Sequence, residues 1–332
     1  MSDFWSEQLS LHTPQPLPNS EIEGHTALYP IPDRQVLSIK GPDSSKFMQG
    51  QFTCQINDIN LNQYRPGACC NAKGRMINTF NLLQSDEHQY LLSLHTSLAD
   101  PTQLHLKKYM VFFKSEMTAT DIVVAGIKGP NAARVLSELF GQCPVDDYAQ
   151  SAFEFGHIIK LPFAAGFELY LPKSTADAVL NKLYSKCLLT TKESWSLNLI
   201  ENGLAQLTNS NIEKFIPQML NLSQAGAVSF SKGCYTGQEI VARMEYLGKL
   251  KRHLYRGCIE DCDTLNVGDA IYTPGHDSPI GEVVNWAQHD GNLEALMVLE
   301  DKYLQNPLYV NSASGPHIQL LSLPYEIIEK SE

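Results

Sequence analysis

Residues 232–239 read Lys-Gly-Cys-Tyr-Thr-Gly-Gln-Glu, which places Cys234 between two glycines. Glycine allows the backbone a positive φ or a close approach to another group, so this stretch indicates a shaped turn. Apolar residues recur at helical spacing over 240–247, which predicts a helix that begins near Gly237. The thiol of Cys234 therefore lies just before a helix.

Two interpretations of Cys234 follow. A cationic neighbour, Lys232, and a helix N-terminus both favour the thiolate, which predicts a reactive or metal-handling thiol. Free cysteine is also commonly buried for packing reasons, so a small buried residue in a glycine-shaped turn is the alternative. The spacing by itself leaves both open.

The bulk properties set wider limits. The chain has 332 residues and a net charge of −11, which predicts two or three domains and argues against broad nonspecific binding to nucleic acid. No stretch approaches the roughly 20 apolar residues of a membrane span, and the N-terminus does not resemble a secretory signal. The eight cysteines are scattered and predict reduced thiols without a zinc site. We expect a cytoplasmic protein.

Apolar runs and turn signals predict an α+β body followed by a small β-barrel. Prolines predict an N-terminal arm over residues 1–33, extended from residue 12 onward. The body is predicted over 34–247, the barrel over 248–326 and a tail over 327–332. Predicted strands include 36–39, 76–83, 89–94, 122–125, 153–161 and 167–171 in the body, and 254–259, 280–286, 295–299 and 317–321 in the barrel. Predicted helices include a short one that Asp43 caps and Gly50 closes, then 132–140, 175–183 and 193–200.

Three further features are candidate sites. Trp195 and Glu201 on one predicted helix would suit a flat heterocycle with N–H donors, and a core tryptophan beside an exposed glutamate is the alternative. The turn at 71–75 carries two cations that could face a ligand. The basic stretch 243–256 could hold an anion or a nucleic-acid backbone, or could be a solvated face.

Several motifs together resemble the YgfZ family of bacterial folate-binding proteins related to the glycine-cleavage T-protein. The octapeptide at 232–239 with Val-Ala-Arg at 241–243 is the most specific match. Four other stretches match the family: 47–53, 71–75, 106–112 and 215–222. The resemblance implies a GcvT-like arrangement of compact parts around a central funnel that binds tetrahydrofolate or a derivative.

Carried over by position, the resemblance makes Cys234 the functional thiol, with Lys232 as its motif partner. It implies folate contacts from Trp195, from Glu201 near the pterin, and from Gln218. In some members a tryptophan on the first strand lies in the folate site, and the matching position here is near Arg34, which could stack or bind the glutamate tail.

One departure bears on activity. Related T-proteins carry an aspartate in the strand after the turn at 71–75, whereas this chain has Asn78 and Thr79 there. A neutral amide or hydroxyl supplies neither the charge nor the basicity of a carboxylate. The sequence therefore argues against aminomethyl transfer.

The resulting hypothesis is a folate-binding accessory protein that supports iron–sulfur cluster assembly or repair, and thereby tRNA methylthiolation. Its expected partners are folate and, transiently, iron–sulfur enzymes, assembly proteins or tRNA-modifying enzymes, without a membrane or stable nucleic-acid contact. The alternatives are a folate-dependent one-carbon transferase and a direct tRNA-binding factor that uses the basic stretch.

Overall fold

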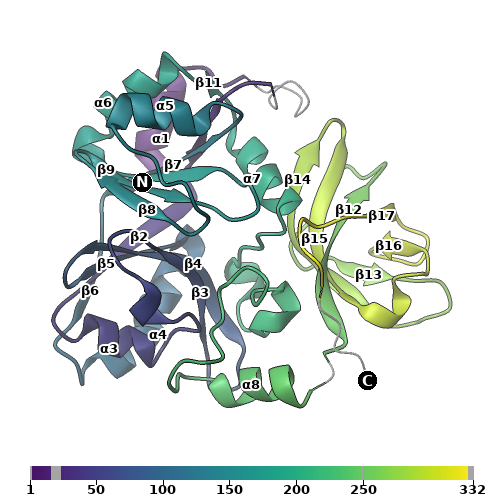
Figure 1. The fold of residues 1–332 in the computed structure, drawn as a ribbon. Coiled ribbons are helices and arrows are strands. Elements are labelled where there is room, and N and C mark those ends of the chain that lie inside the picture. The colour runs from purple at the N-terminus through teal and green to yellow at the C-terminus, as the bar shows by residue number, and fades with distance from the viewer. Residues whose placement is uncertain (1, 16–23, 249, 328–332) are drawn as a thin grey trace. The chain divides into compact units, whose positions relative to one another are not determined.

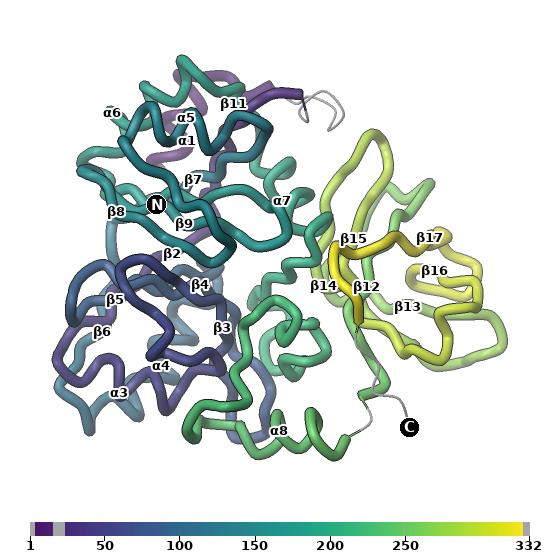
Figure 2. The backbone as a smooth tube through the Cα atoms, viewed as in Figure 1, coloured from purple at the N-terminus to yellow at the C-terminus, as the bar shows by residue number. Residues whose placement is uncertain are grey.

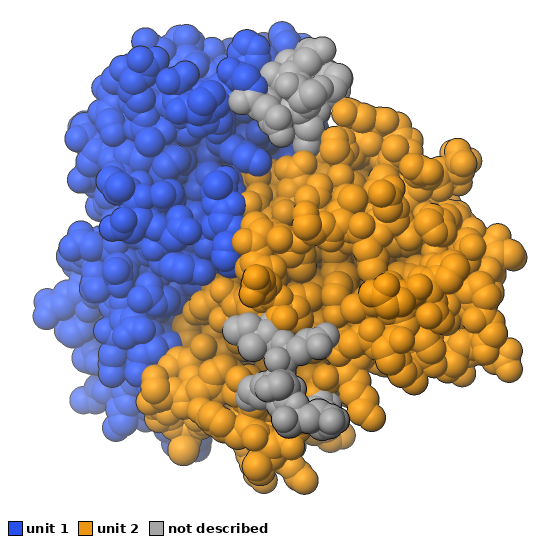
Figure 3. Space-filling model, turned by 45° about the vertical axis from the view of Figure 1, so that its right-hand side comes forward, with its two compact units in different colours: residues 1–51, 55–66, 80–195 blue, residues 52–54, 67–79, 196–332 orange. Residues whose placement is uncertain are grey.

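The computed structural model describes residues 2–15, 24–248 and 250–327, which belong to two compact units (Figure 3). Unit 1 comprises 1–51, 55–66 and 80–195, and unit 2 comprises 52–54, 67–79 and 196–332. Two short pieces of the N-terminal half therefore belong to the same unit as the C-terminal barrel. The predicted boundary near residue 248 differs from this division, since 196–247 belong with the barrel.

Unit 1 contains a six-stranded sheet in the order β11-β1-β7-β10-β9-β8. The strands are β1 Ala27–Ile31, β7 Ile122–Lys128, β8 Gln150–Phe153, β9 Gly156–Lys160, β10 Phe167–Pro172 and β11 Leu188–Leu189. Helices α1 Ser2–Leu11, α5 Ala132–Phe140 and α6 Lys173–Tyr184 gather over one face (Figure 1). Alternate residues of β7 and β10 pack with these helices in one apolar core. Glu168 and Tyr170, the alternate residues of β10, lie on the other face and are buried.

The predicted N-terminal arm is instead folded into unit 1, as a helix at 2–11 and, within the part predicted to be extended, a buried strand at 27–31. Residues 2–11 form α1, and Phe4 and Trp5 are buried in the core of unit 1. β1 is fully buried, pairing parallel with β11 and antiparallel with β7. Pro30 is accommodated within this strand, buried and opposite Ala125 of β7. Residues 16–23 of the predicted arm lie outside the described part of the chain.

A five-stranded sheet has the order β3-β4-β5-β2-β6. Its strands are β2 Arg34–Lys40, β3 Arg65–Cys70, β4 Met76–Asp86, β5 Gln89–His95 and β6 Glu116–Ala119, accompanied by α3 Ser44–Gln49 and α4 Ala99–Met110. The short helix that Gly50 ends is confirmed. Asp43 occupies the predicted N-cap position, but its side chain makes no capping bond and accepts instead from the amide of Lys114, at 2.8 Å.

Beyond α7 (Lys192–Glu201), the chain of unit 2 runs through irregular segments with 3₁₀ turns, visible between α7 and α8 in Figure 2. One of these turns is η4, Pro217–Leu220, which precedes α8, Gln238–Tyr246. The predicted helix near Gly237 is thus confirmed.

The predicted barrel is confirmed as a closed barrel, β12-β15-β14-β13-β16-β17. Its strands are β12 Arg252–Ile259, β13 Ala270–Tyr272, β14 Gly281–His289, β15 Asn292–Glu300, β16 Leu308–Val310 and β17 His317–Leu321. Closure removes the unpaired strand edges that an open sheet would expose. Of the predicted tail, residues 328–332 lie outside the described chain. In the described ranges, no helix has the length and apolarity that crossing a membrane requires.

Candidate functional site

Cys234 lies exposed in the turn before α8, whereas the seven other cysteines are buried or half-buried. Gln238 closes the turn through two hydrogen bonds to Tyr235. Its side-chain Oε1 accepts from the backbone amide of Tyr235 at 3.2 Å, and its backbone amide donates to the Tyr235 carbonyl at 3.1 Å. Tyr235 itself is buried. The thiol is therefore presented to solvent by a turn that is anchored on its inner side.

The two glycines around Cys234 have different roles. Gly237 has a φ of +84°, and a Cβ there would lie 2.4 Å from the carbonyl oxygen of Asn71, so a side chain is excluded. Gly233 has no positive φ, and nothing lies within 4 Å of the place of a Cβ. The backbone conformation thus requires glycine at position 237 and not at position 233. At Gly233 the space beside the thiol is open.

Lys232 is buried beneath the turn. Its Nζ donates to the carbonyls of Phe52 at 2.5 Å and Cys54 at 2.8 Å, and it lies 5.0 Å from the ring centre of Tyr235. Burial lowers the pKa of Lys232 to about 8, although the nearby Cys54 acts to raise it. Two of the three ammonium donors therefore hold residues 52–54 in place, a structural use that the sequence did not indicate.

Two other thiols of unit 2, those of Cys69 and Cys70, are buried and have raised pKa values. Burial raises the pKa of Cys70 to about 12, and burial together with Cys70 raises that of Cys69 well above its ordinary value. Within the described residues, no group of three or more histidine, cysteine or acidic side chains is arranged to hold a metal ion. Exposure thus singles out Cys234 as the accessible thiol of this region.

Asn78, at the position where the related T-proteins would carry an acid, is fully buried. Its Oδ1 accepts from the amide of Cys69 at 3.0 Å, and the neighbouring Thr79 hydroxyl accepts from the amide of Leu207 at 3.1 Å. Both side chains serve as neutral backbone partners. This geometry offers no general base at the position.

Trp195 is buried, with 2% of its surface exposed. Its ring lies against Gly126, where a Cβ would come within 2.6 Å of the indole, and 5.2 Å from the ring of Tyr29. This is the packing expected of a core tryptophan, the alternative raised above. The indole Nε1 has no hydrogen-bond partner among the described residues.

A buried polar cluster that the sequence analysis missed lies beside Trp195. Glu168 is fully buried and pairs with Gly126 in the sheet, so both lie on the face opposite the helices. Its carboxylate accepts from the Tyr170 hydroxyl at 2.6 Å and from Asn81 Nδ2 at 3.1 Å. A single glutamate inside the apolar run 167–171 was the available signal.

Arg34 completes this cluster, with its Nη2 3.5 Å from Glu168 Oε1. The side chains of Arg34 and Glu168 are 6% and 0% exposed, so the pair is removed from solvent. Its charge is already balanced by Glu168, which speaks against the expected role of Arg34 in binding an anionic folate tail. The Nε of Arg34 has no partner among the described residues.

Gln218 and Glu201 occupy different settings. Gln218 is buried in η4, and its Nε2 donates to the carbonyl of Val241 at 2.7 Å, so it ties η4 to α8 and to the turn of Cys234. Glu201 is the last residue of α7 and is half-buried. The predicted residues therefore form two groups, with Lys232, Cys234, Gln218 and Glu201 in unit 2, and Arg34 and Trp195 in unit 1.

The basic stretch has acidic partners at its C-terminal end, over residues 252–256. Arg252 pairs with Glu300 at 2.6 Å, Arg256 pairs with Glu294 at 2.7 Å, and His253 Nδ1 lies 2.9 Å from Asp301. Lys249, a further member of this stretch, lies outside the described residues. The pairs reduce the positive charge that a nucleic-acid backbone would meet.

Comparisons with known proteins agree with this architecture. Residues 25–190 match the family model described as the GCVT N-terminal domain. The chain is 32% identical over 298 residues to the tRNA-modifying protein YgfZ of Escherichia coli (strain SE11), covering 87% of this chain and 86% of that protein. Its identity to the YgfZ protein of Klebsiella pneumoniae (strain 342) is 32% over 308 residues, covering 90% and 89%.

Among solved structures, the glycine cleavage system aminomethyltransferase T from Bartonella henselae superposes with a TM-score of 0.77. The superposition covers 93% of this chain and 88% of that one at 18% identity, which establishes a shared fold. Family membership rests on the sequence relatives and on the domain match. The chain therefore belongs to the YgfZ family and has a GcvT-like fold of mixed helices and sheets that ends in a closed six-stranded barrel.

Proposed function

We propose that this protein supports tRNA modification as a folate-binding accessory factor for iron–sulfur enzymes, with Cys234 as its functional thiol. The relatives named tRNA-modifying proteins support the role in tRNA modification. The observation that carries the proposal is the accessible thiol of Cys234 on a turn fixed from within by Lys232 and Gly237. A fold that needs only packing at this position would bury the cysteine.

The proposed work of Cys234 requires access and a thiolate. Thiolates are the ligands that hold iron–sulfur clusters, and they are also the form that exchanges with disulfides. The open space beside Gly233 leaves room for a client protein or its cluster to approach. Both a transient cluster contact and a redox step depend on the same sulfur atom.

Replacement of the thiol tests this part of the proposal. In a strain that lacks the chromosomal copy, Cys234→Ala should lower the level of methylthiolated tRNA nucleosides toward that of the empty strain. Cys262→Ala is the matched control, because Cys262 is half-buried in the barrel and its thiol donates to the Thr264 carbonyl at 3.3 Å. Normal nucleoside levels in the Cys234→Ala strain would remove the thiol from the function.

The folate part rests on the buried polar cluster of unit 1. Trp195 Nε1 and Arg34 Nε are buried donors without partners in the described residues, and unsatisfied buried groups of this kind call for a ligand or water. Glu168, the buried carboxylate of this cluster, accepts from Tyr170 and Asn81 and pairs with Arg34. These groups fit the edge of a pterin, which carries both ring acceptors and N–H donors. Bound there, tetrahydrofolate would supply one-carbon or redox chemistry.

Calorimetric titration with 5-formyltetrahydrofolate tests the folate part separately. Glu168→Gln should weaken binding by about tenfold or more, because a charged acceptor contributes roughly 1.5–3 kcal/mol. Trp195→Phe keeps a ring while removing the Nε1 donor, and a smaller loss is expected. The matched control is Glu193→Gln, at an exposed position on α7. Its affinity for the folate should equal that of the wild-type protein. Absence of binding by the wild-type protein would overturn the folate assignment.

Aminomethyl transfer is not favoured, because the Asn78 amide is buried and engaged by the backbone of Cys69. An assay for methylene transfer from an aminomethyl donor to tetrahydrofolate should show no turnover above background. Sustained turnover would instead make the protein a transferase.

A further inference from the structure

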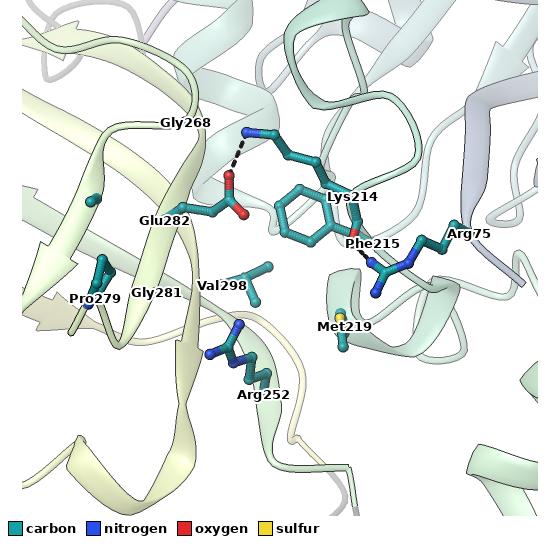
Figure 4. A pocket seen from close by; sticks show the side chains of 11 residues that line it. Arg75, Lys214, Phe215, Met219, Arg252, Gly268, Pro279, Gly281, Glu282 and Val298 are labelled. Carbon is teal, nitrogen blue, oxygen red and sulfur yellow. Dashed lines mark hydrogen bonds and ion pairs between the residues drawn. The ribbon is translucent and has the colours of Figure 1, made fainter. Parts of the chain in front are cut away.

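Unit 2 contains a cavity of about 300 Å³ that the proposed function does not use (Figure 4). Three cations line it: Arg75 at the end of the turn 71–75, Lys214 before η4, and Arg252 at the start of β12. They come from three separate segments of a chain whose net charge is −11. Such a gathering in an acidic protein indicates an anion site.

The cations keep donors available for a ligand. Arg75 donates through Nη1 to the carbonyl of Lys214, and no carboxylate of the described residues is paired with it. Lys214 Nζ contacts Glu282, the acidic side chain of the lining, at 2.7 Å (Figure 4). Arg252 Nη2 pairs with Glu300, which does not line the cavity, at 2.6 Å. A guanidinium has five N–H donors and an ammonium has three, so these contacts leave most of them unused.

Apolar side chains form the rest of the wall. Phe215 and Val298 are buried, and Met219, which belongs to η4, is half-buried. A cavity of this size lies at the lower end of the range for small-molecule sites, which combine apolar walls with a few polar anchors. The lining thus suits an organic body attached to an anionic group.

We propose that this cavity binds the phosphate group of a small phosphate ester. A carboxylate has two oxygens, which one forked arginine can satisfy, whereas a phosphate monoester presents three free oxygens to three cations from different segments. The ester's organic part would lie against Phe215 and Met219. The site includes neither Cys234 nor the cluster around Glu168, so it stands independently of the proposed function.

Titration of the full-length protein tests the site, with adenosine 5′-monophosphate as the probe. The nucleotide should bind in a salt-sensitive way, while adenosine and succinate should bind at least tenfold more weakly. A nucleotide no stronger than adenosine, or succinate of equal affinity, would overturn the assignment to phosphate.

Paired variants locate the binding. Arg75→Met and Arg252→Met should each lower the affinity for the nucleotide by about tenfold, since each removes charge-assisted hydrogen bonds. Their controls are Lys73→Met and Lys251→Met, exposed cations in the same turn and next to the same strand that do not line the cavity. Affinity unchanged in Arg75→Met and Arg252→Met would show that the nucleotide binds elsewhere and would exclude this site.

Glu282→Gln gives a test of opposite sign. It removes the negative charge of the lining and frees Lys214, so nucleotide binding should become tighter. Weaker binding would contradict the proposed role of Lys214. A trinucleotide that binds more tightly than the mononucleotide, with the same loss in Arg75→Met, would support the site with RNA as the source of the phosphate. Equal affinity of the two would support it with a free metabolite.

Discussion

Lys232 carries an ammonium group in a buried position beneath the Cys234 turn, and burial lowers its pKa from 10.5 to about 8. Between these two values the unfolded chain holds a proton that the folded protein has released. Because the unfolded state then binds more protons, the contribution of Lys232 to the free energy of unfolding rises as pH increases from about 8 to 10.5. Below pH 8 both states are protonated and this contribution is constant.

Lys232→Met should remove this pH dependence. The difference in free energy of unfolding between wild type and variant should grow by roughly 3 kcal/mol from pH 7.5 to 10.5, at 1.36 kcal/mol for each unit of pKa difference. At pH 7.5 the variant should still be less stable, by about 1–3 kcal/mol, because the Phe52 and Cys54 carbonyls lose their donor. Urea denaturation over this pH range measures both effects.

The exposed Lys251 supplies the control for this experiment, and Lys251→Met should follow the wild-type curve. Parallel pH curves for wild type and Lys232→Met would show that the ammonium group is not shifted by burial.

At the scale of elements, the beginning of α8 is set by its contacts with the turn at 71–75. Gly237 approaches the Asn71 carbonyl, and a Cβ at Gly74 would lie 2.9 Å from that of Ile240. Two glycines therefore allow the helix and the turn to come together. This packing positions the segment that carries Cys234.

Alanine substitutions at the two motif glycines should differ in their effect on stability, because only Gly237 is required by the backbone conformation. Gly237→Ala should lower the free energy of unfolding by roughly 2–4 kcal/mol, combining a left-handed backbone with a steric clash. Gly233→Ala, in open space without a positive φ, should change it by less than about 0.5 kcal/mol. Denaturant unfolding measures both, and equal costs would contradict the different roles assigned to them.

At the scale of the whole molecule, acidic residues outnumber basic ones by 36 to 25, and the basic stretch at 243–256 is partly neutralised by ion pairs. A role in tRNA modification therefore does not imply a broad RNA-binding face. The proposed phosphate cavity would add about one contact to an RNA phosphate.

Filter binding with unmodified bulk tRNA tests this expectation. The protein should show no saturation at micromolar concentration in 150 mM salt. At lower salt, the plot of log affinity against log salt should have a slope smaller than about 3 in magnitude, since each phosphate contact contributes roughly 0.9 for duplex and 0.7 for single-stranded nucleic acid. Submicromolar binding with a slope of 6 or more would establish a multi-contact tRNA surface instead.

The sequence by itself determined the features that depend on neighbouring residues. Alternating apolar runs between turn residues predicted the barrel strands, and helical spacing after Gly237 predicted α8. The motif at 232–239 with its companion stretches indicated the family, and the relatives at 32% identity confirm it. Local periodicity, turn chemistry and motifs each depend on residues that are close together in the sequence.

Only the tertiary structure decided which charged and polar groups meet. Arg34 and Glu168 are 134 residues apart and become partners through the packing of unit 1. Residues 52–54 receive the ammonium of Lys232, and β1 acquires its two neighbours from residues 122–128 and 188–189. Burial, pKa and the cations of the cavity all depend on such long-range contacts, which no local pattern specifies because they form only when distant segments fold together.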